Sequence, residues 1–338
     1  MEGKRAVFFE VEPWEQEFFR DKLAHHFDLT FYPHRLTLDE VDEAAPANYL
    51  VCFIYSDLSS RLLDHLKHLK GISTMSVGAD HIDLEQTETR HIVVSNVPAY
   101  GPNTVAEHTI ALLLALSRNI VTSVERTREG VYEYQGLTGW DLQGKTIGVI
   151  GTGKIGSLVV KMAIGLGMKV VAYDPKPNQK LALELGFEYA NLPQLLRHSQ
   201  VITLHVPLTA ANKHMLGRPE FAQMTKGVVI LNTARGALIE ADALLEALDT
   251  GIVKQAGIDV LEDEGLLKEE KEFFSPYFKL NDYQTALANH ALMRHPKVLV
   301  TPHNAFNSQE SLKNILQTTV ENLQAMAQGE PINTVGER

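Results

Sequence analysis

The chain has 338 residues, more than one hydrophobic core usually organises, so two domains are expected. Apolar residues make up 44% and charged residues 22%, an ordinary balance for a globular enzyme. The formal net charge of −11 would repel a nucleic-acid backbone over most of the surface. An anionic metabolite would need a local cation to receive it. The composition therefore argues against a nucleic-acid partner and directs attention to individual arginines.

Cysteine content and the N-terminal sequence predict a reducing compartment. Cys52 is the only cysteine, so neither an intramolecular disulfide nor a thiolate metal cluster can form, and no metal site is expected. It lies in an apolar run, residues 50–55, which favours a buried, inert thiol over a nucleophile. The start, MEGKRAVFFEVEPWEQ, is no signal peptide, and the longest apolar run, residues 110–116, is too short to span a bilayer. We expect a cytoplasmic protein without a membrane partner.

The first hundred residues alternate β-rich runs with helical patterns. The predicted strands are RAVFFEV, LTFYP, YLVCFIY and GISTMSV, in chain order. An amphipathic helix is expected from Trp14 to Phe27, and helical spacing recurs in LLDHLKHL. Such an alternation predicts a parallel sheet covered by helices.

A connector with two prolines and a glycine, residues 96–103, follows this series. Thr104 and Glu107 have the spacing of a capping box and are expected to open a helix over TIALLLALSRNIV. Because this run is apolar nearly all round, the helix should be buried between domains or between subunits. His108 within it is interpreted as a hydrogen-bonded core histidine.

A second series of strands begins at Leu142. Its predicted strands are KTIGVIG, KVVAYD, VITLHVP, GVVILNTARG, QAGIDV and KVLVTPH, and several are apolar on both faces, as central parallel strands should be. A helix over residues 241–248 should stop at Gly251. Residues 265–295 are less regular and are interpreted as an insertion with no assignable function. A closing helix is then expected over residues 308–327, capped by Asn307 with Glu310 three residues on.

A glycine-rich turn indicates a dinucleotide site. Strand TIGVI leads into Gly151-Thr152-Gly153-Lys154-Ile155-Gly156 and then into an apolar helix. The GxGxxG pattern alone is weak, but the strand–turn–helix context predicts a pyrophosphate at the helix N-terminus. Asp174 ends the next strand about 20 residues on, and its carboxylate would bind ribose hydroxyls and repel a 2′-phosphate. NAD is therefore predicted rather than NADP. A turn cap before Pro175 is the alternative for Asp174, and Lys176 leaves exclusion of NADP open.

Three polar residues follow predicted strands, where open α/β sheets bind ligands. They are Arg235 after VVILN, Glu264 after AGIDV and His303 after VLV. Reduction of a 2-keto acid needs a cation for the carboxylate and a proton donor for the developing alkoxide. Arginine suits the first role, and histidine held by a carboxylate suits the second. Spacing alone does not select this set from 14 histidines and 42 acidic residues, since His205 and His290 also fall near strand or loop ends.

From Ser76 to Asp83 onward the chain resembles the D-isomer-specific 2-hydroxyacid dehydrogenases, above all their D-lactate dehydrogenase branch. NVPAYGPNTVAEH, GTGKIG, HVPLT, LNTARG, GIDVLEDE and VTPHNAF occur in the family's order and spacing, over essentially the whole length. The resemblance implies an α/β fold of two Rossmann-like or flavodoxin-like lobes with parallel sheets and the active site in the cleft between them. The substrate-binding domain would comprise residues 1–101 plus 301–338, and the NAD-binding domain residues 102–300. A homodimer is implied through the helix after Thr104.

The same resemblance implies the roles of individual residues. The catalytic residues would be Arg235, Glu264 as the partner of the histidine, and His303 as acid/base. Substrate contacts would come from Val77 and Gly78 through backbone N–H groups, and from Tyr55, Tyr100, Arg235 and Phe306. Cofactor contacts would come from Tyr100, Gly151, Gly153, Lys154, Ile155, Gly156, Asp174, Val206, Pro207, Asn212, Thr233, Ala234, Arg235, Asp259 and His303. His205 becomes a strand-end neighbour of the cofactor, and His81 a structural residue of the substrate loop.

The expected substrate depends on the aromatic residues that would line the pocket for its side chain. Tyr55, Tyr100 and Phe306 are similar to the residues that keep the pocket small in lactate-type members, which favours reversible NADH-dependent reduction of pyruvate to the D-2-hydroxy acid. Ordinary packing accounts for an aromatic residue at Tyr55 about as well as a role in the pocket does. In addition, the lactate branch usually has an aromatic residue at the position of Asn307. A branched 2-keto acid, as in D-2-hydroxyisocaproate-type enzymes, and hydroxypyruvate are therefore alternatives.

Three other functions of related proteins are less consistent with the sequence. Phosphoglycerate oxidation is less expected because no regulatory domain follows residue 338. Formate oxidation is disfavoured because that branch does not use a glutamate at the position of Glu264. An NAD-sensing, corepressor-like binding protein would retain the same catalytic residues, but the sequence shows no disordered tail or extra partner-binding segment of the kind such a scaffold would use.

Overall fold

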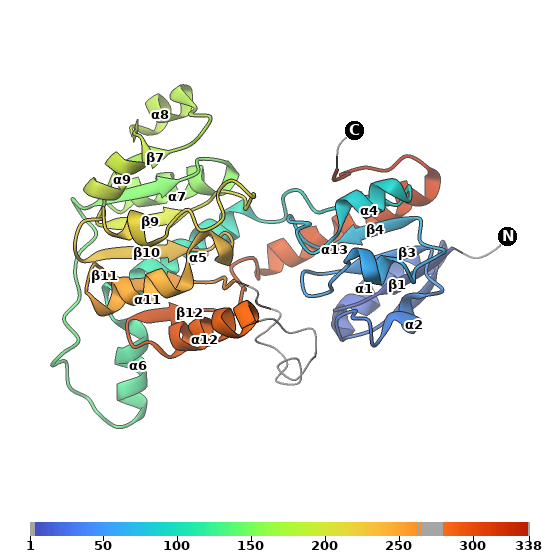
Figure 1. Ribbon diagram of the computed structural model, residues 1–338, viewed down its shortest axis with the longest axis horizontal. Coiled ribbons are helices and arrows are strands. Elements are labelled where there is room, and N and C mark those ends of the chain that lie inside the picture. Colours follow the sequence, from blue (N-terminus) through green and yellow to red (C-terminus); the bar gives the residue numbers. More distant parts are fainter. Residues whose placement is uncertain (1–3, 263, 265–279, 337–338) are drawn as a thin grey trace. The chain divides into compact units, whose positions relative to one another are not determined.

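A computed structural model describes residues 4–262, 264 and 280–336 of the chain, which divides into two compact units (Figure 1). Unit 1 comprises residues 1–101 and 307–338, and unit 2 comprises residues 102–306. Unit 2 thus ends at residue 306, whereas the predicted NAD-binding domain ended at residue 300. The reason is local, because Thr301 and Ala305 donate hydrogen bonds to the carboxylate of Asp259 in unit 2.

Unit 1 is built on a five-stranded sheet in the order β2-β1-β3-β4-β5, with every pairing parallel. Its strands are β1 (Arg5–Phe8), β2 (Asp28–Phe31), β3 (Tyr49–Cys52), β4 (Gly71–Thr74) and β5 (Val93–Ser95). Its helices are α1 (Pro13–Leu23), α2 (Val41–Ala44), α3 (Ser60–Leu63), α4 (Leu84–Thr89) and α13 (Gln309–Gln328). The sequence predicted the first four strands. It missed the edge strand β5, which has only three residues.

The core of unit 1 lies on both faces of this sheet. Val7, Leu50, Cys52 and Ile72 join one fully buried apolar cluster, while α13 packs against α1 and β4. Burial raises the pKa of the Cys52 thiol well above its ordinary value, which keeps the thiol protonated and inert, as expected.

The closing helix α13 begins one residue later than the sequence suggested. Its cap is Ser308, whose hydroxyl accepts a hydrogen bond from the N–H of Ser311. The prediction of Asn307 as the cap is therefore wrong. Serine and asparagine are comparable caps, and only the backbone conformation decides which residue holds that position.

Unit 2 contains a seven-stranded parallel sheet in the order β12-β11-β10-β9-β6-β7-β8. Its strands are β6 (Thr146–Ile150), β7 (Lys169–Tyr173), β8 (Glu188–Tyr189), β9 (Val201–Leu204), β10 (Val228–Asn232), β11 (Val253–Ile258) and β12 (Val298–Val300). All six predicted strands are present. The two-residue strand β8 was missed.

Helices cover both faces of this sheet. They are α5 (Pro102–Ser117), α6 (Ile120–Arg128), α7 (Lys154–Gly165), α8 (Gln179–Leu185), α9 (Leu192–His198), α10 (Arg218–Phe221), α11 (Ala241–Asp249) and α12 (Leu280–Arg294), with a short 3-10 turn at Gly236–Leu238. Helices α5 and α7 pack on one face, and α9, α11 and α12 on the other. Along β6, Ile147 and Val149 join one apolar layer and Ile150 joins the other, the alternation expected of a strand buried on both sides.

Two helix predictions in unit 2 need correction. Helix α5 begins at Pro102, so Thr104 lies inside its first turn and the proposed capping box is wrong. The helix also ends at Ser117, because Asn119 adopts a left-handed conformation (φ 51°) and separates α5 from α6. The predicted stop of α11 before Gly251, which has φ 74°, is confirmed.

The predicted insertion, residues 265–295, divides into two parts. Residues 265–279 lie outside the described residues. Residues 280–294 form α12, which packs against α11 and β12 and is thus part of the core of unit 2. Among the described residues, no helix combines the length and the hydropathy that crossing a membrane would require.

Candidate active site

The carboxyl edge of the unit 2 sheet gathers the candidate residues. Parallel strands all end at the same edge, and the strand order reverses beside β6, where open α/β sheets bind ligands. The residues that follow the strands there are Gly151 after β6, Asp174 after β7, His205 after β9, Thr233 after β10, Asp259 after β11 and His303 after β12. The fold thus brings Gly151 and His303, which are 152 positions apart in the sequence, to one edge of the sheet.

The glycine turn after β6 leaves room for a ligand. Gly151 has φ 93°, and a Cβ atom on Gly156 would lie 1.9 Å from the carbonyl oxygen of Gly151, so both positions require glycine. A Cβ atom on Gly153, at the N-terminus of α7, would meet nothing within 4 Å. The turn therefore offers open space beside backbone N–H groups at a helix N-terminus, which fits the pyrophosphate of a dinucleotide.

Asp174 is tied to this turn. Its Oδ2 accepts hydrogen bonds from the N–H of Thr152 (2.8 Å) and from the Thr152 hydroxyl (3.0 Å), and its Oδ1 accepts the N–H of Lys176 (2.8 Å). Partial burial opposes ionisation, but these hydrogen bonds outweigh it and lower the pKa of Asp174. The carboxylate is therefore charged at neutral pH, as an acceptor for ribose hydroxyls must be. The role of Thr152 was not predicted, although this residue lies inside the glycine motif.

The loop after β10 is shaped by a buried amide. Asn232 is 1% exposed, its Nδ2 donates to the carbonyl of Arg235 (2.9 Å), and its Oδ1 accepts the N–H of Ala234 (3.0 Å). A Cβ atom on Gly236 would lie 2.0 Å from the carbonyl carbon of Leu261. The loop that carries Arg235 therefore lies directly against the loop that leads to Glu264. This role of Asn232, a polar residue at the end of an apolar run, was not predicted from the sequence.

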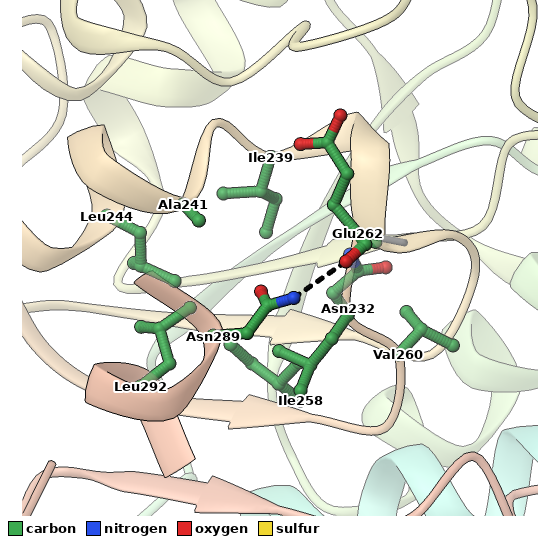
Figure 2. A pocket seen from close by; sticks show the side chains of 11 residues that line it. Asn232, Ile239, Ala241, Leu244, Ile258, Val260, Glu262, Asn289 and Leu292 are labelled. Carbon is green, nitrogen blue, oxygen red and sulfur yellow. Dashed lines mark hydrogen bonds between the residues drawn. The ribbon is translucent and has the colours of Figure 1, made fainter. Parts of the chain in front are cut away.

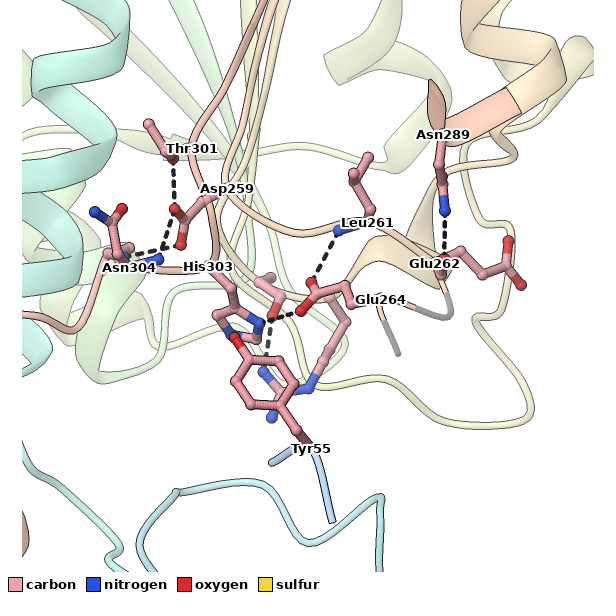
Figure 3. A network of polar contacts seen from close by, with 12 residues as sticks. Tyr55, Asp259, Leu261, Glu262, Glu264, Asn289, Thr301, His303 and Asn304 are labelled. Carbon is pink, nitrogen blue, oxygen red and sulfur yellow. Dashed lines mark hydrogen bonds and ion pairs between the residues drawn. The ribbon is translucent and has the colours of Figure 1, made fainter. Parts of the chain in front are cut away.

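His303 and Glu264 face each other in this edge (Figure 3). His303 Nδ1 lies 2.7 Å from Oε2 of Glu264, and Oε1 of the same carboxylate accepts the N–H of Leu261 (2.9 Å). Because Nδ1 donates to the carboxylate, Nε2 is the ring nitrogen left to exchange a proton with a ligand. The structure thus brings together the imidazole and the carboxylate that the resemblance paired.

A buried aspartate holds the loop that carries His303. Asp259 is 2% exposed, and its Oδ1 accepts the N–H of Asn304 (3.0 Å) and the hydroxyl of Thr301. Its Oδ2 accepts the N–H of Ala305 (2.9 Å), and its carbonyl oxygen accepts the N–H of His303 (2.8 Å). His303 has φ 50°, a conformation that residues other than glycine rarely adopt. Asp259, predicted only as a cofactor contact, therefore also fixes this conformation.

The other histidines considered have different surroundings. His108 Nε2 lies 3.1 Å from the hydroxyl of Thr301, which confirms its reading as a hydrogen-bonded histidine. His205 bonds to the hydroxyl of Thr203 (2.9 Å), and desolvation lowers its pKa to about 3, so its ring is neutral at physiological pH. His290 is exposed on α12.

The remaining cofactor candidates of unit 2 lie at the same edge. Lys154 is exposed and Ile155 half-buried at the start of α7, and Val206 is half-buried after β9. Asn212 uses its amide inside its own loop, since its Oδ1 accepts the N–H of Thr209 (2.7 Å) and its Nδ2 donates to the carbonyl of Pro207 (2.8 Å). The backbone rather than the side chain of this loop is therefore available to a ligand.

Unit 1 presents its own candidates at the carboxyl edge of its sheet. Among the described residues, the N–H groups of Val77 and Gly78 donate to no acceptor. The carbonyls of the two residues are held by Asn96 Nδ2 (2.6 Å) and by the Ser76 hydroxyl (2.6 Å), respectively. His81 Nε2 lies 3.3 Å from the hydroxyl of Thr74, consistent with a structural role. The loop is thus rigidly held while its N–H groups stay available to an anion.

Two further aromatic candidates belong to different units. The carbonyl of Tyr100 in unit 1 accepts a hydrogen bond from Asn314 Nδ2 (2.9 Å). Phe306 is the last residue of unit 2 and is half-buried. Among the described residues, no three His, Cys, Asp or Glu side chains are placed to hold a metal ion.

A small cavity lies beneath the loops of unit 2 (Figure 2). Ile239, Leu244, Ile258 and Leu292 line it together with Asn289, whose Nδ2 donates to the carbonyl of Glu262 (2.6 Å). Its volume of about 10 Å³ is close to that of one water molecule. It is too small for a keto acid and belongs to the packing of the loops.

Known proteins share this fold and sequence. Residues 110–305 match the family described as D-isomer specific 2-hydroxyacid dehydrogenase, NAD binding domain. D-lactate dehydrogenase of Escherichia coli (strain K12) is 40% identical over 306 residues, 90% of this chain and 91% of that protein. The crystal structure of D-lactate dehydrogenase from Aquifex aeolicus complexed with NAD and lactic acid superposes with a TM-score of 0.86 at 34% identity, over 96% of each chain. The solved structure of the pyruvate reductase of Chlamydomonas reinhardtii superposes with a TM-score of 0.86 at 32% identity, over 98% of each chain.

These matches cover the fold, the glycine turn and the loops of the candidate site. The chain belongs to the D-isomer-specific 2-hydroxyacid dehydrogenases, and its relatives include D-lactate dehydrogenases. It is an NAD-dependent oxidoreductase, and the open space at Gly153 and the charged carboxylate of Asp174 fit that cofactor.

Proposed function

We propose that the chain reduces pyruvate to the D-2-hydroxy acid with NADH, in a reversible reaction. The observation that carries this proposal is the His303–Glu264 pair, at 2.7 Å, on the same sheet edge as the glycine turn. The proposed proton donor and the proposed dinucleotide cradle therefore share one edge of the sheet. The names of the relatives, D-lactate dehydrogenase and pyruvate reductase, support a small keto acid as the substrate.

The proposed roles follow from the chemistry of each group. NADH supplies the hydride that the carbonyl carbon of the keto acid accepts. The guanidinium of Arg235 binds the substrate carboxylate and polarises the carbonyl, and the N–H groups of Val77 and Gly78 contribute to holding the carboxylate. His303 donates a proton from Nε2 to the carbonyl oxygen, which completes the hydroxyl group, while Glu264 stabilises the imidazolium and holds its orientation.

The choice of pyruvate depends on the aromatic side chains. We propose that Tyr55, Tyr100 and Phe306 limit the space for the substrate side chain. A methyl group then fits better than an isobutyl or benzyl group. The alternative substrates, 2-ketoisocaproate and hydroxypyruvate, would be preferred if the space is larger than these rings suggest.

The experiment is a steady-state assay of NADH absorbance with pyruvate, hydroxypyruvate, phenylpyruvate and 2-ketoisocaproate. His303→Ala and Arg235→Gln should each abolish turnover while NADH fluorescence still reports binding, because neither change touches the glycine turn. His290→Ala, on the exposed face of α12, is the matched control and should behave as wild type. Wild-type turnover in both site variants would contradict the catalytic roles. Turnover below about one per second on every keto acid would instead favour an NAD-sensing binding protein.

We also propose a homodimer, through a different helix from the one first expected. Most apolar side chains of α5 are covered within unit 2 by α7 and β11. Helix α6 has no buried residue and exposes Ile120 (51%), Val121 (38%) and Val124 (43%), and Tyr132 and Tyr134 are exposed after it. An apolar surface of this kind commonly marks a subunit interface. Light scattering of wild type and Val124→Glu tests this, and a monomeric wild type would contradict it.

A further inference from the structure

One carboxylate of unit 1 organises a turn that the sequence analysis linked to the substrate. Glu10, just beyond β1, accepts four hydrogen bonds from the turn that follows β3. Its Oε2 accepts the N–H of Phe53 (3.1 Å), the N–H of Ser56 (3.1 Å) and the Ser56 hydroxyl (2.6 Å). Its Oε1 accepts the N–H of Tyr55 (3.0 Å). Three backbone N–H groups therefore converge on one carboxyl group, as they do in the backbone concavities that bind anions. Burial raises the pKa of Glu10, and these hydrogen bonds oppose the rise because they favour the charged form.

The backbone of Glu10 is constrained to make these contacts. Glu10 has φ 62°, in the left-handed region that glutamate rarely adopts. Its N–H donates to the carbonyl of His34 (3.0 Å), while the preceding Phe9 N–H donates to the carbonyl of Val51 on β3 (2.9 Å). Such a conformation persists only where its surroundings hold it, and such sites tend to be functional.

The turn 53–56 is fixed at its far end as well. Ser56 is fully buried, and its hydroxyl also accepts the N–H of Leu36 (2.9 Å). Two residues on, the N–H of Leu58 donates to the carbonyl of His81, in the loop that continues from Val77 and Gly78 (2.9 Å). Tyr55 therefore lies on a turn whose backbone is held by Glu10, and its side chain is half-buried. The segment that follows this turn contacts the loop of Val77 and Gly78, which is assigned to the substrate carboxylate.

We propose that Glu10 is a positioning residue for substrate selectivity: its carboxylate fixes the 53–56 turn and thereby the ring of Tyr55, which limits the size of the keto-acid side chain. This inference rests on the proposed function, in which Tyr55 forms part of the pocket wall. Glu10 itself does not contact the substrate. Its effect should therefore be seen in the choice between substrates and in KM, rather than in the proton and hydride steps that Arg235 and His303 serve.

The main test is Glu10→Gln, which keeps the shape but replaces one of the two acceptor oxygens with an NH₂ group that faces an N–H donor. KM for pyruvate should rise about tenfold, with kcat within about twofold, because hydrogen bonds to a charged acceptor are lost while the reacting groups stay in place. The ratio of kcat/KM for phenylpyruvate to that for pyruvate should rise. Glu15→Gln is the matched control. Glu15 is a buried carboxylate of unit 1 that accepts the N–H of Glu12 (2.8 Å), at the start of α1 rather than in the 53–56 turn.

A double-mutant cycle shows whether Glu10 acts through Tyr55. In a Tyr55→Ala background, Glu10→Gln should no longer change the selectivity ratio, because the ring it positions is gone. Ser56→Ala, which removes one of the four donors, provides a second variant with a smaller rise in KM, about threefold. If Glu10→Gln does not fold, Ser56→Ala in the same cycle decides the question.

The outcomes separate this inference from the proposed function. Wild type that reduces keto acids, with Glu10→Gln and Ser56→Ala matching its KM and selectivity, overturns the role of Glu10 alone. An equal effect in Glu15→Gln, or an undiminished effect in the Tyr55→Ala background, also overturns it. Wild type that reduces no keto acid removes the proposed function and, with it, this inference.

Discussion

His303 and Glu264 form a hydrogen-bonded pair, with Nδ1 of the imidazole 2.7 Å from Oε2 of the carboxylate. The pair joins the loops that follow β12 and β11, which are neighbouring strands. One carboxylate oxygen binds the imidazole and the other binds the N–H of Leu261. The side chain therefore has a fixed orientation before any ligand arrives, which is the arrangement that a proton donor needs.

Replacing the carboxylate should slow the reaction. Glu264→Gln is expected to lower kcat about ten- to a hundredfold, because an amide cannot stabilise the imidazolium by charge. Glu262→Gln, two residues away, is the matched control, since Glu262 contacts Lys213 and His214 instead. Steady-state kinetics with pyruvate measure both. Equal kcat values for Glu264→Gln and wild type would show that the pair does not serve proton transfer.

Asp259 should matter for catalysis through the conformation of the His303 loop. Asp259→Asn replaces an acceptor of three donors from residues 301–305 and should lower kcat about a hundredfold, since a displacement of 1 Å can have that effect. The melting temperature should fall as well, because a buried charged acceptor is lost. Asp249→Asn, with a side chain 78% exposed, is the control. A variant with normal kcat and stability would contradict the role.

Two glycines of the same turn should behave differently. Gly156→Ala places a Cβ atom 1.9 Å from the carbonyl oxygen of Gly151 and should lower the stability of the fold. Gly153→Ala places its Cβ atom in open space, so the melting temperature should match wild type while NADH affinity falls about tenfold or more. Thermal melts and NADH fluorescence titration distinguish the two. Unchanged NADH binding in Gly153→Ala would place the pyrophosphate elsewhere.

The charge of Asp174 should select between the two dinucleotides. In Asp174→Ser the carboxylate no longer repels a 2′-phosphate, and Lys176 nearby could then attract it. The preference for NADH over NADPH, as a ratio of kcat/KM, should fall about a hundredfold. Kinetics with both cofactors provide the measurement. An unchanged ratio would mean that Asp174 serves only to hold Thr152 and the turn.

His205 should make the fold sensitive to acid. Desolvation lowers its pKa from 6.5 to about 3 in the folded protein, so between these values the unfolded chain binds a proton that the folded chain does not. The contribution of neutral His205 to the free energy of unfolding is fully present above pH 6.5 and is lost progressively as pH falls from 6.5 toward 3. Denaturant unfolding of His205→Gln should show a flatter dependence between pH 4 and 6.5. Parallel curves for variant and wild type would rule this out.

Local signals in the sequence were enough for much of the fold. A strand, a glycine turn and a helix within about 20 residues encode the cofactor cradle, and the alternation of strands and helices encodes parallel sheets. Parallel strands have a direction, so the sequence also predicts that Arg235, Glu264 and His303 follow strands at one edge. Very short elements such as β5 and β8 were missed because two or three residues carry too little periodicity.

Only the tertiary structure decided which side chains hold the site together. Glu10 bonds to Phe53 across 43 residues, and Asp259 to Asn304 across 45, and neither contact leaves a pattern in the sequence. Spacing likewise did not select His303 from the other histidines; a family resemblance did. The physical reason is that periodicity and turn chemistry act over a few residues, whereas a hydrogen bond between loops depends on the register of the neighbouring strands that carry them.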